Sequence, residues 1–152
     1  DFRLGNFSWS FMVQWKAGHV FRRQSIGPGA EYNGVYHMDY FQRWRQPGDE
    51  TKTNIPAGGV YGETDPRVRT IYEYSEVLLE PASHLRLRDV NLSYTLHNQR
   101  WERLPMKSMR VFVYARNLGV IWRKNKLGID PDFANAEYVT PKTFALGLQV
   151  DF

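Results

Sequence analysis

The end of the chain, residues 144–152, alternates strictly between two kinds of side chain. The apolar set is Phe144, Leu146, Leu148, Val150 and Phe152, and the small or polar set between them is Ala145, Gly147, Gln149 and Asp151. Successive side chains of a β-strand point to opposite faces, so a period of two predicts a strand with one apolar face. That face has to be covered, either by a protein core or by lipid.

Three further segments have an extended pattern. In residues 6–18 one face carries Phe7, Trp9, Phe11, Val13 and Trp15. In residues 84–96 one face carries Val90, Leu92, Tyr94 and Leu96, and Arg86 and Arg88 are predicted to continue that face toward the start of the strand. Residues 109–118 have two faces that are both fairly apolar, so the pattern does not indicate which of them points outward.

Long and short connections separate these strands. Residues 19–82 are rich in turn-forming Gly, Pro and Asn, and a short helix is indicated only within 36–45. A connection of this length favours a functional loop. Residues 97–107 form a short connection, and 119–141 a second long one. In it, Asp130-Pro131-Asp132 is predicted to cap a turn rather than to bind calcium or act as an acid–base pair.

Composition excludes several classes of function. The 152 residues contain no cysteine, which excludes disulfides and sulfur-ligated zinc, and the four histidines lie far apart without metal-site spacing. A dispersed net charge of +4 without a recognition motif gives no indication of nucleic acid binding. No apolar run approaches the roughly 18 to 20 residues of a spanning helix. No nucleophile, phosphate-loop or dinucleotide motif is present, so we expect no enzyme, cofactor or metal.

Strands of about ten residues joined by connections of unequal length are typical of a transmembrane β-barrel, but four strands cannot close one. Two architectures follow: a soluble antiparallel sandwich, or the tail of a much larger barrel. The chain starts at Asp1 without an initiator methionine or a signal peptide. We therefore expect it to be a piece of a longer protein.

Several stretches, taken in order, resemble the C-terminal end of SusC/RagA-type TonB-dependent transporters. They cover nearly the whole chain: FSWSFMVQWKAGHVF, DYFQRWRQPGDETKTNIP, LRLRDVNLSYTL, MRVFVYARNLGVI, LGIDPDF and YVTPKTFALGLQVDF. His84, Asp132 and Lys142 stand where the family usually has an aromatic residue, Glu and Arg. The signal peptide, the TonB box, the plug and most of the barrel of such a transporter are not among these residues.

The resemblance implies an all-β fold of antiparallel strands from the C-terminal end of a large transmembrane β-barrel, a fragment that cannot close alone. Residues 1–152 would form a barrel segment with extracellular loops at about 19–82 and 119–141. The family imports bulky nutrients, either oligosaccharides or peptides, across the outer membrane of Gram-negative bacteria of the Bacteroidetes type. TonB supplies energy through the missing N-terminal part, a SusD-like surface lipoprotein caps the barrel, and lipid surrounds it.

In this family setting, the expected site residues are aromatic. Tyr36, Tyr40, Trp44 and Tyr61 are predicted to face substrate or the lid protein, since Tyr and Trp are favoured at binding surfaces. The resemblance makes Phe152 part of the signal read by the outer-membrane assembly machinery.

A second interpretation belongs to a different class. A soluble β-sandwich module that binds carbohydrate, with exposed aromatic side chains stacking on sugar rings, would show the same alternation. Solubility and a monomeric state would distinguish such a module from a barrel segment.

Overall fold

A computed structural model describes residues 1–26, 37–57, 65–97, 106–136 and 138–152. The chain divides into two compact units. The first unit, the sheet unit, comprises Asp1–His19 and Ala82–Phe152, and the second, the inserted unit, comprises Val20–Pro81.

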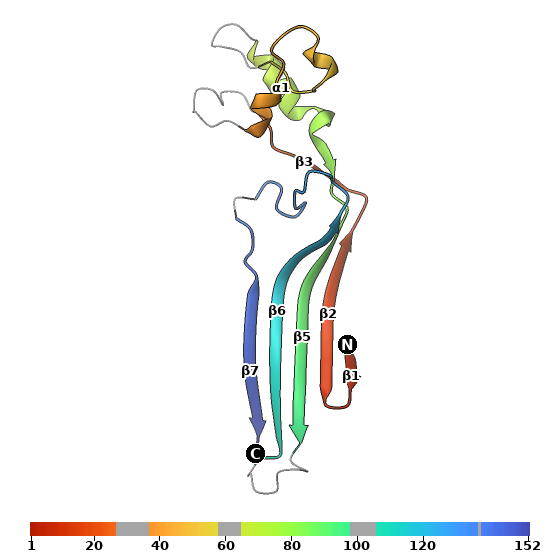
Figure 1. Ribbon diagram of the computed structural model, residues 1–152, viewed down its shortest axis with the longest axis vertical. Coiled ribbons are helices and arrows are strands. Elements are labelled where there is room, and N and C mark those ends of the chain that lie inside the picture. The colour runs from red at the N-terminus through yellow and green to blue at the C-terminus, as the bar shows by residue number, and fades with distance from the viewer. Residues whose placement is uncertain (27–36, 58–64, 98–105, 137) are drawn as a thin grey trace. The chain divides into compact units, whose positions relative to one another are not determined.

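The sheet unit is built on five strands, each antiparallel to its neighbours: β1 (Phe2–Leu4), β2 (Phe7–Lys16), β5 (His84–His97), β6 (Ser108–Arg123) and β7 (Thr143–Asp151). Their order across the sheet is β1-β2-β5-β6-β7, as Figure 1 shows. The sheet is not closed, because β1 and β7 each pair on one side only. The expectation of an all-β fold made of antiparallel strands that cannot close alone is therefore confirmed.

No helix in the described part of the chain has the length and apolar character needed to cross a bilayer.

The register determines which residues share a face, because directly opposed residues of paired strands lie on the same side of a sheet. One face, the apolar face, carries the rows Phe7, Tyr94, Val111, Leu148; Trp9, Leu92, Val113, Leu146; and Phe11, Val90, Ala115, Phe144. The opposite, polar face carries the rows Ser8, Ser93, Phe112, Gly147 and Ser10, Asn91, Tyr114, Ala145. In β6 the odd-numbered residues 111–115 are thus on the apolar face, which the sequence pattern had not decided.

The alternation of β5 changes at Arg88. Its sequence neighbours pair with the consecutive residues Met12 and Val13 of β2, so Arg88 is an extra residue without a partner in the register, a β-bulge. Beyond the bulge, Arg86 pairs with Gln14 on the polar face, and the Arg88 side chain also turns there, donating from Nε to Gln14 Oε1 at 2.8 Å. The prediction that both arginines continue the apolar face is wrong, since one added residue exchanges the faces of all residues beyond it.

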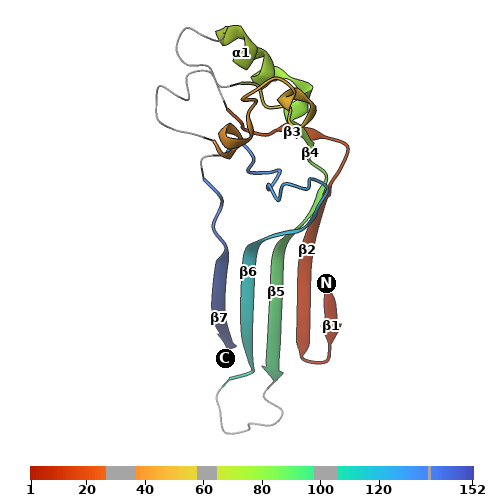
Figure 2. The same cartoon turned by 45° about the horizontal axis from the view of Figure 1, so that its top comes forward.

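The inserted unit begins and ends on a short antiparallel ribbon of β3 (Val20–Arg22) and β4 (Leu79–Pro81). Between these strands the described residues form the 3-10 helices η1 (Met38–Gln42), η2 (Asp49–Thr51) and η3 (Glu76–Leu78) and the α-helix α1 (Pro66–Tyr74); Figure 2 shows the unit from a second direction. The unit has a hydrophobic core of its own, formed by Ile26, Ile55, Tyr72 and Leu78, with Tyr40 packed against it.

The helix α1 was not predicted. Within 19–82 a helix is expected only at 36–45, whereas Asp65 accepts a hydrogen bond from the backbone N–H of Arg67 and caps a helix that starts at Pro66. An Asp cap followed by Pro at the first helical position is a recognised start signal of a helix, so the start of α1 could have been predicted from the sequence. The short helix indicated within 36–45 is present as η1, and Tyr36 lies outside the described residues.

Candidate functional site

The apolar face of the sheet unit exposes large side chains on all four of its long strands, although Ala115 on the same face is buried. Phe11 is 54% exposed, Phe144 67%, Leu146 76% and Leu148 62%. An exposed area that contiguous is unusual for a soluble protein and indicates a surface that is covered by something outside these residues. The large exposed side chains of β7, Phe144, Leu146 and Leu148, all lie on this face, so the cover is expected on this side.

Aromatic side chains mark two levels of the apolar face. At one level Trp15, Leu85 and Trp122 are directly opposed across three strands. At the other, Phe7 is opposed to Tyr94. Trp15 and Phe7 are eight residues apart on β2, which at roughly 3.3 Å per residue separates the two levels by about 26 Å along the strand.

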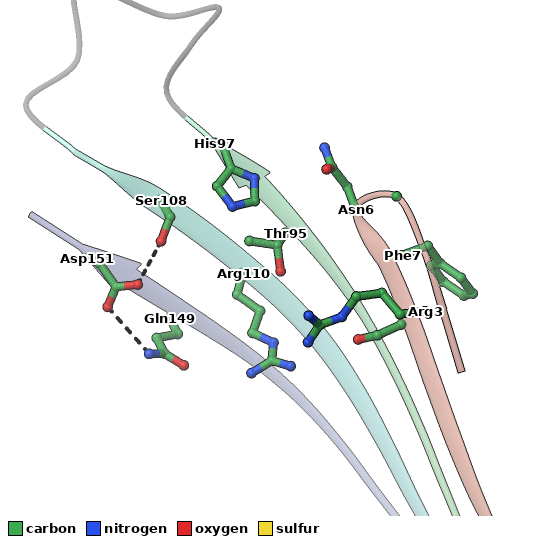
Figure 3. A pocket seen from close by; sticks show the side chains of 11 residues that line it. Arg3, Asn6, Phe7, Thr95, His97, Ser108, Arg110, Gln149 and Asp151 are labelled. Atoms are coloured by element: carbon green, nitrogen blue, oxygen red, sulfur yellow. Dashed lines mark hydrogen bonds between the residues drawn. The ribbon is translucent and has the colours of Figure 1, made fainter. Parts of the chain in front are cut away.

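The polar face is held together by side-chain hydrogen bonds between strands. Ser8 and Ser93 share a hydrogen bond of 2.6 Å between their hydroxyl oxygens, and Tyr114 donates from its hydroxyl to Asp89 Oδ1 at 2.8 Å. Near the ends of β5 and β7 this face contains a hollow of about 290 Å³, whose lining side chains are drawn in Figure 3. The sheet is therefore amphipathic, and the hollow lies on its polar face.

A cluster of charged side chains surrounds Asp132, in the connection between β6 and β7. Lys16 donates from Nζ to Oδ1 at 2.6 Å, while Arg86 Nε lies 2.9 Å from Oδ2. His84 Nε2 is 3.4 Å from the same oxygen and Arg88 Nη2 is 3.6 Å from it. The Arg86 and His84 contacts with Oδ2 fall outside hydrogen-bond geometry. The Arg86 contact is an ion pair, and His84 Nε2 lies close to the same oxygen.

Burial makes this cluster unusual. His84 is fully buried and Arg86 is 3% exposed. Arg86 also pairs with Asp130 and lies over the ring of Phe133, 5.2 Å from its centroid. Burial alone would raise the pKa of Asp132, but the hydrogen bond and charge of Lys16, together with the charges of His84 and Arg86, hold that pKa below its usual range. The cluster fixes residues 130–133 to β2 and β5.

The turn predicted at Asp130-Pro131-Asp132 is confirmed. Asp130 Oδ1 accepts from the backbone N–H of Asp132 at 3.1 Å, and its carbonyl accepts from the N–H of Phe133 at 3.1 Å. The role of the two carboxylates as counter-ions of buried cations was not predicted, because Arg86 had been placed on the other face. No set of three His, Cys, Asp or Glu side chains suited to a metal occurs in the ranges that the structure covers.

The predicted aromatic site residues lie in the inserted unit, as far as they are described. Tyr40 packs against the core, with the Arg43 guanidinium 3.8 Å from its ring centroid. Trp44 donates from its indole N–H to the carbonyl of Thr53 at 2.5 Å. Tyr36 and Tyr61 lie outside the described residues. Both described residues thus take part in folding this unit, and each is only half buried.

More exposed apolar side chains of the inserted unit had not been singled out. Met38 is 74% exposed, Ile71 70% and Tyr74 69%. Ile71 and Tyr74 are three residues apart on α1 and so share one helix face. The apolar spacing along 68–74 was the available signal, and it was missed together with the helix.

Asp39 anchors η1 to the rest of the inserted unit. Its carboxylate pairs with Arg23 and accepts from the Ser25 hydroxyl at 2.5 Å, and that hydroxyl also lies 2.9 Å from the Tyr72 hydroxyl. Burial would raise the pKa of Asp39, but the hydrogen bonds from Ser25 and Arg23 and the charge of Arg23 lower it overall. This network joins η1 to Arg23 and Ser25 and, through the Tyr72 hydroxyl, to α1.

Phe152 is the last residue, one position beyond the end of β7, and is 76% exposed. Its predicted role in assembly depends on the resemblance and stays a prediction.

The fold is that of an open, antiparallel, two-faced sheet carrying an inserted unit between β2 and β5. Among solved structures it is similar to chains of the RagAB peptide importer in the "open-open" state and of the RagAB peptide transporter, with TM-scores of 0.63 and sequence identities of 22% and 23%. Each match covers 97% of this chain but only 16% of the other. No model of a known protein family and no curated protein matches. The similarity to SusC/RagA-type transporters suggested by the motifs is therefore confirmed at the level of fold.

Proposed function

We propose that this chain is a wall segment of a TonB-dependent transporter in the outer membrane of a Gram-negative bacterium. The observation that carries the proposal is the two-faced open sheet, whose apolar face is exposed while its polar face is hydrogen-bonded and hollowed. Lipid on one side and a polar lumen on the other suit such a sheet, and the open edges β1 and β7 would continue into further strands.

The dimensions of the sheet support this proposal. Outer-membrane barrels have an apolar band about 25 Å tall, flanked by aromatic residues at both interfaces. The two aromatic levels of the apolar face are separated by about 26 Å along β2, and somewhat less along the membrane normal if the strands tilt. Trp15 and Trp122 would then lie at one interface, and Phe7 and Tyr94 at the other.

The proposed cargo is a bulky nutrient, and we favour a peptide over an oligosaccharide. The similar solved structures are those of a peptide importer and a peptide transporter, which supports a peptide as the cargo. A SusD-like lipoprotein would cap the barrel, TonB would act through the remainder of the chain, and a Bacteroidetes-type outer membrane is the proposed location. The mechanism would be binding and gating, without covalent chemistry.

The inserted unit is proposed to form the extracellular surface that meets cargo or the lipoprotein. Tyr40 and Trp44 contribute half-buried edges to it, and Met38, Ile71 and Tyr74 contribute exposed apolar surface. Aromatic and methionine side chains of this kind are enriched where proteins bind partners.

A soluble sugar-binding sandwich is the competing function. A sandwich buries one face of each sheet against a second sheet. Within the described residues, the 76% exposure of Leu146 is at odds with such a cover.

The test uses the full-length gene product. We expect it in the outer-membrane fraction, and we expect cells that express it to take up labelled peptide in a TonB-dependent manner. Replacing residues 20–81 by a short turn should abolish uptake or lipoprotein association while leaving the protein in the outer membrane. Recovery of the full-length protein in a soluble fraction would overturn the proposal, and uptake of oligosaccharide in place of peptide would reverse the proposed order of cargo.

A further inference from the structure

Two arginines line the hollow of the polar face. Arg3 comes from β1 and Arg110 from β6, and Figure 3 shows their guanidinium groups extending toward each other over the strands between them. Arg110 donates from Nε to Ser93 Oγ at 3.3 Å. Across the described ranges, neither guanidinium has a carboxylate within ion-pair distance, whereas other arginines of these ranges, such as Arg23, Arg67 and Arg116, do.

The carboxylate of Asp151 lines the same hollow and already accepts hydrogen bonds from its neighbours. Asp151 accepts from the Ser108 hydroxyl at 2.7 Å and from Gln149 Nε2 at 3.4 Å, both drawn in Figure 3. Two guanidinium groups and one carboxylate leave an excess of one positive charge. The two like charges repel each other; both side chains are exposed, so solvent screens part of this repulsion, and a bound anion would offset the rest.

The chemistry of the recess selects the kind of anion. A guanidinium presents a planar fork of donors that matches a carboxylate in a bidentate manner. One carboxylate would neutralise the excess charge, whereas a dianion such as phosphate would leave a net negative charge beside Asp151. The hydroxyl groups of Ser8 and Thr95 line the recess as additional donors.

We propose that this hollow is a binding site for a single carboxylate group, held between Arg3 and Arg110. The carboxylate can come from an acidic side chain of a peptide in transit along the polar face, or from an acidic side chain in the part of the longer chain that lies outside these residues. The first source rests on the proposed peptide import; the second does not.

The test compares two variants of the full-length protein. One carries Arg3→Gln and Arg110→Gln together. The control carries Arg116→Gln, which removes a positive charge from the same face at a residue that already contacts Asp89 and the Tyr114 hydroxyl. The probes are two terminally blocked peptides that differ only in one Glu or Gln, so the side chain is the sole carboxylate.

If the peptide is the source, the double variant should bind the Glu peptide about tenfold more weakly in detergent solution, and the Gln peptide unchanged, since a charge-assisted hydrogen bond contributes on this scale. If the chain itself is the source, peptide affinity stays constant but the melting temperature of the double variant falls further than that of the control.

If no carboxylate occupies the hollow, the expected change in melting temperature has the opposite sign. Removing two repelling charges would then raise the melting temperature and leave the affinity for both peptides unchanged, and this result would overturn the proposal. Uptake by the unaltered transporter is scored separately. Absence of uptake of both peptides refutes peptide import, while the melting temperatures still decide whether a carboxylate occupies the hollow.

Discussion

The ring of Phe112 on β6 lies over Gly147 on β7. The two residues are directly opposed on the polar face, and a Cβ atom built on Gly147 would fall 2.1 Å from Cζ of the ring. Because Gly147 has no side chain, the Phe112 ring can occupy the space above it. An aromatic ring that covers a glycine on the neighbouring strand helps to fix strand register.

Substituting Gly147→Ala should destabilise the protein by about 1 to 3 kcal/mol, because the ring has to leave its place. The same substitution in a Phe112→Ala background should be close to neutral. Unfolding of the detergent-solubilised full-length protein, measured for both single variants and the double variant, gives the coupling between them. Additive effects would mean that the ring does not occupy this space.

Arginine substitutions at two adjacent residues of β7 should have different effects. Leu146 is on the apolar face and Ala145 on the polar face. If lipid covers the apolar face, Leu146→Arg should cost about 2 to 4 kcal/mol near mid-strand, and Ala145→Arg much less. Refolding into lipid vesicles followed by denaturant titration measures both, and equal costs would contradict the assignment of the faces.

The charged cluster around Asp132 should make stability depend on pH. The pKa of Asp132 in the folded state is below the ordinary value. The contribution of Asp132 to the free energy of unfolding is therefore present above the unfolded pKa of about 4 and is lost as pH falls through the folded pKa. The melting temperature of the unaltered protein should therefore drop on acidification below about pH 4.

Asp132→Asn is the matched control for this titration. It should melt at a lower temperature at pH 7, since Lys16 and Arg86 lose a counter-ion, and the difference from the unaltered protein should shrink in acid. A difference that stays constant from pH 7 to pH 3 would show that Asp132 does not stabilise through its charge.

Removing Phe152 should reduce the amount of protein in the outer membrane but not its stability. The residue lies beyond the last strand and is exposed, so its truncation loses little packing. Phe152→Tyr, which keeps a terminal aromatic ring, should restore the amount. Measurement pairs outer-membrane abundance with the melting temperature after refolding in detergent, and a parallel fall of both would assign Phe152 to packing alone.

The long strands were predictable from sequence because their signal is local. Alternation located β2, β5 and β7. The apolar run at 109–118 located β6, which continues to Arg123, so the first residues of the expected loop 119–141 belong to this strand. The faces of β5 were predicted only as far as the bulge, since nothing about Arg88 itself distinguishes a bulge residue from a paired one. The error at Arg86 then hid the cluster around Asp132, whose members come from β2, β5 and the connection after β6 and meet only when the strands are paired.

The inserted unit was the hardest part to predict. Its core joins Ile26 and Ile55, which are distant in sequence, to Tyr72 and Leu78. Its helix had a local start signal at Asp65-Pro66, but its 3-10 helices are too short to produce a periodic pattern. The hollow at Arg3 and Arg110 needed the register across several strands, and a single sequence does not contain it.

The first and last residues of the inserted unit, Val20 and Pro81, are paired with each other. Because these two ends are adjacent, the inserted unit connects β2 to β5 in the same way as a hairpin turn would, whatever residues lie between the ends. Residues 20–81 can therefore be exchanged for an unrelated insert without disturbing the register of the strands that carry them. The proposed extracellular surface and the strands that carry it can thus change at separate rates.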